Sequence, residues 1–419
     1  MRNPFLSSAA ALLLVLLLWS AAALALPLEH AVERAIERDD ALKSAERRVA
    51  AMDESAIADG ELPDPEIMIG AEGVPVDDPF SADMMTMYKL GVRQRFPAGQ
   101  SRTLSQQRGR SNAQALTAGA QSRRLDVVRQ TRMAWLDWVS AGQSLALARD
   151  SATAFGELLE ITQARYRSGS GRQRDISQAR LELALLQRRI IQAETRLDEA
   201  WAQLQRWTGP LAPVTPPSQK PAWPQPAAVE ALEQQLTNHP LVIVDQHRIE
   251  AGRIDTQLAR QSYRPQWMIE AGYAHQRGTD PMTQRSQSDK LFAMVSFSVP
   301  LFTSNRQDRR LAASNAELQA REFDRDSRLQ SMTGQLHRQH SLWQSNQQHL
   351  ELIDQTVLVE AEATVEATLS AYRSDRASFD ELIRARLALL QQQLERIDIR
   401  RERDAAAIEL DYLTAGSLL

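Results

Sequence analysis

The stretch Pro265-Gln266-Trp267-Met268-Ile269 decides the fold, because the chain contains a second version of it. The earlier version is Pro65-Glu66-Ile67-Met68-Ile69, at an offset of 200 residues, and each version follows a segment with helical periodicity. Five further matches occur in the same order, at offsets that rise from 203 to 207 residues. They are Arg95-Phe96-Pro97 with Ser298-Val299-Pro300, Ser111-Asn112-Ala113 with Ser314-Asn315-Ala316, Tyr166-Arg167-Ser168 with Tyr372-Arg373-Ser374, Ala179-Arg180-Leu181 with Ala385-Arg386-Leu387, and Thr208-Gly209 with Ala415-Gly416. Ordered matches of this kind indicate an internal duplication.

The two copies are joined by a segment that neither a helix nor a regular strand tolerates. Residues 210–226 contain seven prolines, and proline breaks helices and removes donors from sheets. We therefore predict a first structural repeat at residues 26–209, a proline-rich linker at 210–226 and a second structural repeat at 227–419.

The N-terminus is typical of an exported protein. Arg2 precedes an apolar run from Ala9 to Leu26 that contains the triplet Ala23-Leu24-Ala25, and this layout predicts a signal peptide at residues 1–25. The alternative is an N-terminal membrane anchor, for which the run is at the lower limit of length. No other stretch approaches the roughly 20 apolar residues of a transmembrane helix, so a mature chain that enters a membrane must do so as strands.

Composition narrows the class of protein. The formal charge is −4 over 419 residues, without the basic surface of a nucleic-acid-binding protein, so we expect no nucleic-acid partner. The absence of cysteine excludes disulfides, thiolate metal ligands and an acylated N-terminal cysteine. Aromatic content is only 5% and Ala, Leu, Gln, Arg and Glu dominate, which favours long helices. We predict a mainly α fold with a small β part.

Each repeat is predicted to contain the same succession of elements. An entry helix ends at a proline-containing turn, a β-hairpin with a long polar tip follows, and two long helices complete the repeat. In the first repeat these elements are Leu28–Gly60, a hairpin at about 66–96, Gln100–Arg167 and Arg174–Trp207. In the second they are Ala227–Gln261, a hairpin at about 266–301, Asn305–Arg373 and Phe379–Leu413.

The long helices have the pattern of a coiled coil. Apolar or small residues recur at a 3,4 spacing for more than three heptads, which marks a helix–helix seam. They are Leu183, Leu186, Ile190, Ala193, Leu197, Ala200, Leu204 and Trp207. At about 1.5 Å per residue, a helix of ~68 residues extends on the order of 100 Å, longer than a globular domain requires.

The strands alternate apolar with polar or small residues, most clearly at Trp267, Ile269, Ala271 and Tyr273. One face of each hairpin is therefore apolar. Four such strands in one chain leave open edges and exposed apolar surface. Closure with two further chains would give a 12-stranded barrel whose apolar face meets lipid. The alternative is a small soluble sheet packed on the helices.

The whole mature sequence resembles the TolC family of outer membrane efflux proteins. The resemblance is carried by the duplicated plan, by the hairpin exits Phe96-Pro97-Ala98-Gly99-Gln100 and Val299-Pro300-Leu301-Phe302, and by the turns Tyr166-Arg167-Ser168-Gly169 and Tyr372-Arg373-Ser374-Asp375. It implies a homotrimer with four strands per chain in a 12-stranded outer-membrane β-barrel, continuous with a periplasmic α-helical tunnel. It also implies contact with outer-membrane lipid and docking on a periplasmic adaptor (a membrane fusion protein) and an inner-membrane pump.

The resemblance places the turns at the periplasmic tips of the helical hairpins, where the tunnel narrows and the adaptor binds. Carried over by position, Asp175 and Glu381 would form carboxylate rings of the aperture, with Arg174 and Arg384 as neighbouring partners. The same two carboxylates can instead simply favour the N-termini of their helices. This sequence departs from the family pattern at Asp375, which replaces a glycine, and at Arg384, where a second ring carboxylate often occurs. The complete tip set is Tyr166, Gly169, Arg174, Asp175, Tyr372, Asp375, Asp380, Glu381 and Arg384.

No catalytic constellation or cofactor motif is recognisable, so we expect neither an enzyme nor a bound cofactor. His337 and His340 lie three residues apart on one helix, but no carboxylate or third histidine follows at a fitting spacing, and a solvated helix face is the simpler interpretation. Methionines gather near the hairpins at Met84, Met85, Met87, Met282 and Met294. Thioethers suit soft cations such as Cu(I), and the first hairpin looks similar to TolC members that serve heavy-metal efflux pumps, but methionine is also a common adaptable hydrophobe.

The leading hypothesis is a passive exit duct in the outer membrane for small solutes. Heavy-metal cations are one candidate cargo, and drugs, other organic solutes or secreted polypeptides are the alternatives. The rival hypothesis is a soluble periplasmic coiled-coil scaffold or pump adaptor. An adaptor usually carries a compact β-module between its helices, whereas two equivalent hairpins favour the duct.

Overall fold

The computed structural model describes residues 26–76, 85–212, 214–217, 223–279 and 282–416. The predicted signal peptide at 1–25 and Met84 lie outside the described residues. The chain divides into two compact units, and each unit takes segments from both halves of the sequence. The first contains the described residues up to Leu42, Ser122–His239 and the described residues from Ser331 onward, and the second contains Lys43–Gln121 and Pro240–Gln330.

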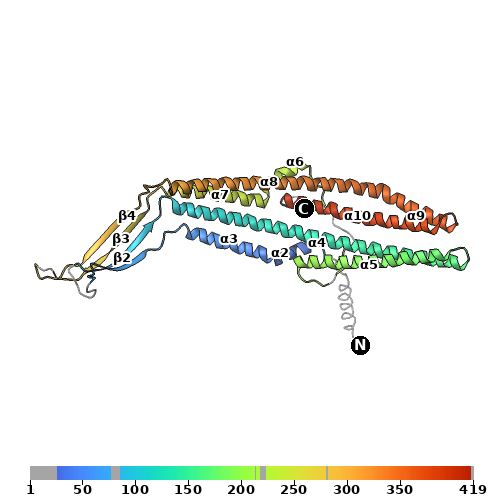
Figure 1. Cartoon of the computed structure of the whole chain (residues 1–419), viewed down its shortest axis with the longest axis horizontal. Helices are drawn as coiled ribbons and strands as arrows, with labels where there is room; N and C mark the ends of the chain where they lie inside the picture. The colour runs from blue at the N-terminus through green and yellow to red at the C-terminus, as the bar shows by residue number, and fades with distance from the viewer. Residues whose placement is uncertain (1–25, 77–84, 213, 218–222, 280–281, 417–419) are drawn as a thin grey trace, which may run out of the picture. The chain divides into compact units, whose positions relative to one another are not determined.

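The order of elements is the same in the two halves of the chain (Figure 1). The first half contains α2 (Leu28–Arg38), α3 (Asp40–Ala58), β1 (Glu66–Glu72), β2 (Met87–Phe96), α4 (Ser101–Arg167) and α5 (Gln173–Thr208). The second half contains α6 (Val229–Gln235), a 3-10 turn (Leu236–Asn238), α7 (Pro240–Gln261), β3 (Trp267–Gln276), β4 (Lys290–Phe297), α8 (Gln307–Leu352), a π-helical segment (Ile353–Val357), α9 (Leu358–Arg373) and α10 (Phe379–Leu413). The predicted fold, mainly helical with four strands, is confirmed.

The four strands form one antiparallel sheet in the order β1-β2-β3-β4. Both predicted hairpins are present, and they are joined to each other through β2 and β3, where Leu90 lies opposite Tyr273. This central pairing links residues about 180 positions apart in sequence, as in the pair of Leu90 with Tyr273. β1 and β4 are the edge strands of the described sheet.

The entry segment predicted at Leu28–Gly60 is helical, but it consists of two helices that are separated by a break at Asp39. Asp39 has an extended backbone, and its carboxylate accepts the backbone N–H of Leu42 at 2.6 Å, so it caps the start of α3. Arg123 of α4 holds the same carboxylate at 2.6 Å. The carboxylate of Asp39 therefore stabilises the break through two interactions, the cap on Leu42 and the ion pair with Arg123. Aspartate is a favoured residue at a helix N-terminus.

The second entry helix, predicted at Ala227–Gln261, is also divided. It consists of α6, the 3-10 turn and α7. α7 begins at Pro240, and a proline at the first helical position lacks only an N–H that would have no partner inside the helix. Proline thus restarts the helix here rather than ending it.

The helix predicted at Asn305–Arg373 contains an irregularity that the sequence did not reveal. Between α8 and α9, residues Ile353–Val357 form a π-helical segment. A π turn accommodates one extra residue within a helix. Ile353 is buried in the segment, and Asp354 pairs with Arg396 of α10 at 2.5 Å.

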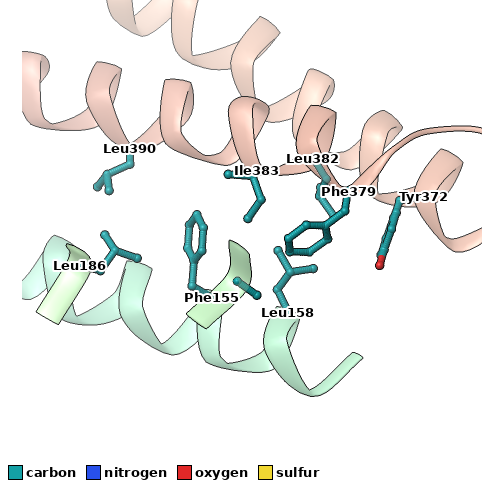
Figure 2. Close-up of a cluster of buried hydrophobic side chains, with 9 residues drawn as sticks. Phe155, Leu158, Leu186, Tyr372, Phe379, Leu382, Ile383 and Leu390 are labelled. Carbon is teal, nitrogen blue, oxygen red and sulfur yellow. The ribbon is translucent and has the colours of Figure 1, made fainter. Parts of the chain in front are cut away.

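Two apolar clusters lie among the described residues of the first unit. One surrounds Trp135 and Trp138 of α4, which pack with Leu28 and Ala31 of α2 and with Leu204 of α5. The other joins the α4–α5 hairpin to the α9–α10 hairpin: Figure 2 shows Phe155, Leu158 and Leu186 directed toward residues of α9 and α10. Their partners are Tyr372, Phe379, Leu382, Ile383 and Leu390. The predicted seam on α5 faces inward, with Leu186, Ala193 and Leu204 buried.

Candidate functional site

One face of the sheet is apolar and exposed across all four strands. The register aligns Ile69, Leu90 and Tyr273 with Leu291 in one row, and Ile269 with Val295 in another. Phe96 is half-buried on this face, and the other large side chains of the face are exposed despite their apolar character. They are Ile67, Ile69, Tyr88, Leu90, Val92, Trp267, Ile269, Tyr273, Leu291, Val295 and Phe297. We call this surface the apolar sheet face.

Aromatic residues lie toward both ends of the apolar sheet face. Phe96, Trp267 and Phe297 are register partners toward one end of the strands, and the rings of Trp267 and Phe297 lie 5.1 Å apart. Tyr88 and Tyr273 lie toward the other end. Aromatic bands on both sides of an apolar zone are typical of strands that cross a membrane.

The opposite face of the sheet carries charged side chains in pairs. Arg93 of β2 binds Glu270 of β3 at 2.5 Å and approaches Glu66 of β1 at 3.5 Å. Lys89 pairs with Glu72. We call this surface the polar sheet face.

Two glycines lie side by side at the centre of the polar sheet face. Gly91 and Gly272 are register partners, and the ring of Phe292 lies over both of them. A Cβ on Gly272 would lie 2.4 Å from the carbonyl oxygen of Leu90 and 2.7 Å from the Phe292 ring. The position therefore requires glycine.

The two predicted tip turns, Tyr166–Gly169 and Tyr372–Asp375, have the same backbone. At each turn a residue with positive φ follows the helix, Gly169 at 81° and Asp375 at 57°. The N–H of Ser170 donates to the carbonyl of Arg165 at 3.0 Å, and the N–H of Arg376 donates to the equivalent carbonyl of Ala371 at 2.8 Å. Asp375 thus occupies a left-handed position that normally favours glycine.

Arg165, which sequence reasoning missed, connects the two tip turns. Its guanidinium pairs with the carboxylate of Asp375 and donates to the carbonyl of Tyr372. The guanidinium also lies 4.6 Å from the centre of the Tyr372 ring. The carboxylate that Asp375 supplies, where the family pattern has glycine, therefore forms an ion pair between the first-half turn and the second-half turn. No local pattern in the sequence indicates this pairing, since the two residues are 210 positions apart.

The predicted carboxylates at the tips have different environments. Asp175 is buried, and the Nε of Arg174 lies 3.9 Å from its carboxylate. Glu381 is exposed and closes a capping box with Ser378 at the start of α10, accepting the Ser378 N–H at 2.9 Å. Sequence reasoning missed this capping box, although its signal, Ser378 three residues before a glutamate, is readable in the sequence.

Arg384 pairs with Asp380 rather than with Glu381, contrary to the proposed partnership. Gln178 of α5 donates a hydrogen bond to Asp380 at 3.0 Å, a second link between the halves that the sequence did not reveal. This hydrogen bond, with the charges of Arg384 and Arg174, holds the pKa of Asp380 below its ordinary value. Tyr166 is exposed, whereas Tyr372 is buried against Phe379.

The methionines do not form one cluster in the described chain. Met68, Met87, Met268 and Met294 share the polar sheet face, but the register puts each of them in a different row. Met85 and Met282 are exposed beside the hairpins, and Met84 lies outside the described residues.

One histidine of the pair His337 and His340 contacts a carboxylate that the sequence spacing did not indicate. His337 pairs with Glu233 of α6 at 2.6 Å. This carboxylate comes from a distant helix, so spacing along the sequence could not indicate it. Even so, no group of three or more His, Asp and Glu side chains in the described ranges is placed to hold a metal ion.

In the part of the chain that the structure describes, no helix is both long enough and apolar enough to cross a membrane.

The sequence pattern of the family Outer membrane efflux protein matches residues 31–210 and 231–416. The chain therefore belongs to the outer membrane efflux protein family. It is an outer-membrane channel that extends into the periplasm, and channels of this family are not enzymes.

Solved structures share the fold at low sequence identity. The chain matches CusC with a TM-score of 0.79 and 16% identity, covering 94% of this chain and 93% of that chain. It matches the outer membrane protein VceC from Vibrio cholerae with a TM-score of 0.76 and 16% identity, covering 94% and 97%. The outer membrane channel CmeC from Campylobacter jejuni matches with a TM-score of 0.76 and 12% identity, covering 93% and 86%. No protein of curated function matches the sequence.

Proposed function

We propose that three copies of this chain form a passive exit duct, in which twelve strands close a barrel in outer-membrane lipid and the helices form a periplasmic tunnel. The apolar sheet face carries this proposal. It exposes large apolar side chains on all four strands while β1 and β4 remain edge strands. A sheet with these properties is stabilised when copies pair edge to edge and lipid covers the apolar side.

We further propose that the duct works with a periplasmic adaptor and an inner-membrane pump through the tip turns. The support is the matched geometry of the two turns and their links through Arg165 and Gln178. The residues assigned to the aperture and the adaptor contact are Tyr166, Gly169, Arg174, Asp175, Tyr372, Asp375, Asp380, Glu381 and Arg384.

Small solutes are the proposed cargo, with heavy-metal cations as the first class to test. Four thioethers on the polar sheet face support this choice, because thioether sulfur suits soft cations. A deletion strain is compared with its complemented parent for sensitivity to copper, silver, zinc and a panel of organic toxicants. Sensitivity confined to organic compounds would exclude the metal cargo and leave the duct in place.

The duct is tested by fractionating a Gram-negative host that expresses the chain. We expect a heat-resistant trimer in the outer-membrane fraction and ionic conductance when the purified trimer is added to planar bilayers. A monomer released by osmotic shock would instead support a soluble scaffold or adaptor. For the tips, Glu381→Gln is compared with Asp150→Asn, which changes an exposed carboxylate of α4. Only the first is expected to alter conductance or adaptor co-purification.

A further inference from the structure

Helix α5 exposes a basic surface in its first 25 residues. Five arginines are exposed between Gln173 and Leu197, whereas the carboxylates of the same stretch are buried or partly covered. The arginines are Arg174, Arg180, Arg188, Arg189 and Arg196. Apolar side chains lie among them: Leu181 is 58% exposed and Ile191 is 63% exposed. We call these residues, with Leu185, the basic edge.

The π-helical segment and α9 expose the opposite charge. No lysine or arginine occurs from Leu352 to Tyr372. Five acidic residues in and beside this stretch are exposed, and they are Glu351, Asp354, Glu360, Glu362 and Glu366. Apolar side chains are again exposed among them, Leu352 at 57% and Val359 at 54%. We call these residues the acidic edge.

Most of these charges have no ion-pair partner within the described chain. Arg180, Arg188, Arg189 and Arg196 form no ion pair with another described residue, and the same is true of Glu360, Glu362 and Glu366. The exceptions are Asp354, which is held by Arg396 and Arg400, and Arg174, which lies 3.9 Å from the carboxylate of Asp175. Unpaired charges around exposed leucine, isoleucine and valine are a surface that a complementary surface would stabilise.

The two edges also match along the helix direction. At about 1.5 Å per residue, Arg180 lies about 10 Å from the start of α5, and Glu366 lies about 10 Å from the end of α9. By the same measure, Leu185 lies at about 18 Å and Val359 at about 21 Å. Both distances are counted from the tip turns, which face each other through Arg165. A rotation about an axis parallel to the helices keeps each residue at its height, so equal heights are what a symmetric ring requires.

We propose that the basic edge of one copy binds the acidic edge of the next copy, head to tail, and that this contact closes the ring of subunits beside the tips. A second copy is the occupant because both complementary edges belong to the same chain on different helices, which is the condition for a closed ring. The proposal rests on the proposed duct and names the surface that assembles it.

Charge reversal in pairs tests the contact. Arg188→Glu with Arg189→Glu reverses the basic edge, and Glu360→Arg with Glu362→Arg reverses the acidic edge. Each pair places like charges opposite each other, and we expect at least about a tenfold loss of heat-resistant trimer from the outer-membrane fraction. The four-fold variant restores opposite charges and is expected to recover the trimer. Arg309→Glu with Arg310→Glu, two exposed arginines of α8, is the matched control and is expected to leave the trimer unchanged.

A second measurement does not depend on reversed charges. The chain contains no cysteine, so Leu185→Cys with Val359→Cys introduces the only two thiols. A short bismaleimide added to membranes is expected to produce covalent dimers and trimers of this variant. Val359→Cys with Ile57→Cys, an exposed position of α3, is expected to remain monomeric after denaturation.

Three results would overturn the inference: an undiminished trimer after single-edge reversal, no recovery in the four-fold variant, or no cross-linking between copies of the variant that combines Leu185→Cys with Val359→Cys. Variants that keep the trimer but lose the adaptor would assign the edges to the adaptor and also overturn it. Failure of the proposed duct is separate, since then the unmodified protein itself would not be a trimer in the outer membrane.

Discussion

The first and second halves of the chain build the same succession of elements with different local solutions. α4 runs without interruption from Ser101 to Arg167, whereas its second-half counterpart is α8, a π-helical segment and α9. The first tip turn uses Gly169 at its left-handed position, and the second uses Asp375. The hairpins, in contrast, keep the same alternation of faces. Where many residues must share one face the pattern of the two halves is preserved. Single positions differ: the tip turns reach the same backbone with different residues, and a π-helical segment interrupts the second long helix but not α4.

The strongest test of this comparison is a one-residue deletion in each long helix. Deleting Asp150 from α4 rotates the following residues by about 100° and removes Phe155 and Leu158 from their cluster, at a cost on the order of 5 kcal/mol or more. Deleting Gln355 removes the extra residue of the π segment and keeps both flanking helices in register, so the loss is expected to be much smaller. Trimer yield and urea unfolding measure the difference. Equal losses would mean that the π segment is not an inserted residue.

Equivalent hairpin positions give the second test. Ile69→Lys and Ile269→Lys each place a charge on the apolar sheet face, and a lysine facing lipid costs about 2–4 kcal/mol near the middle of a membrane. We expect both to reduce the outer-membrane trimer. Met68→Lys and Met268→Lys, one residue earlier on the polar sheet face, are the controls and should have little effect. Loss of trimer in the controls but not in the isoleucine variants would reverse the assignment of the faces.

The tip turns give the third test. Gly169→Ala adds a side chain at a φ of 81° and should destabilise by about 1 kcal/mol through the backbone alone, because its Cβ meets nothing within 4 Å. Asp375→Ala keeps the positive φ and loses the ion pair with Arg165, for a loss of about 1 kcal/mol. Asp375→Gly loses the ion pair but removes the backbone strain of a positive φ, so its free energy of unfolding should be close to that of the parent chain. Urea unfolding at neutral pH ranks the three. A glycine variant as unstable as the alanine variant would show that the ion pair dominates.

The smallest expected effect is a pH dependence at Asp380. Its pKa is lowered by the hydrogen bond from Gln178 and by neighbouring arginines, so its stabilising contribution is present above its ordinary pKa and is lost as the pH falls through the lowered value. We expect the thermal midpoint to fall less below about pH 4 in Asp380→Asn than in the parent chain. Asp150→Asn should keep the parental profile. Identical profiles for all three proteins would remove Asp380 from the tip contact.

Much of the fold was predictable from periodicity. The hairpin bounds Glu66–Glu72 and Met87–Phe96, the long α4 and α5, and the turns at their ends follow from alternation, 3,4 spacing and duplication. The capping box at Ser378 was also present in the sequence, although it was not recognised. Periodicity did not reveal the break at Asp39 or the π segment, because each changes the backbone locally without interrupting the apolar pattern over many residues; Arg123 and Arg396 from other helices pair with residues at these two places.

The sequence by itself determined the duplicated plan, the mainly helical class, the four strands and the family. These properties are repeated over many residues, so local patterns reveal them. Only the tertiary structure decided that Arg165 pairs with Asp375 and that Gln178 donates a hydrogen bond to Asp380. Such contacts depend on how distant helices are aligned in space, and a short-range pattern of residue types carries no information about that alignment.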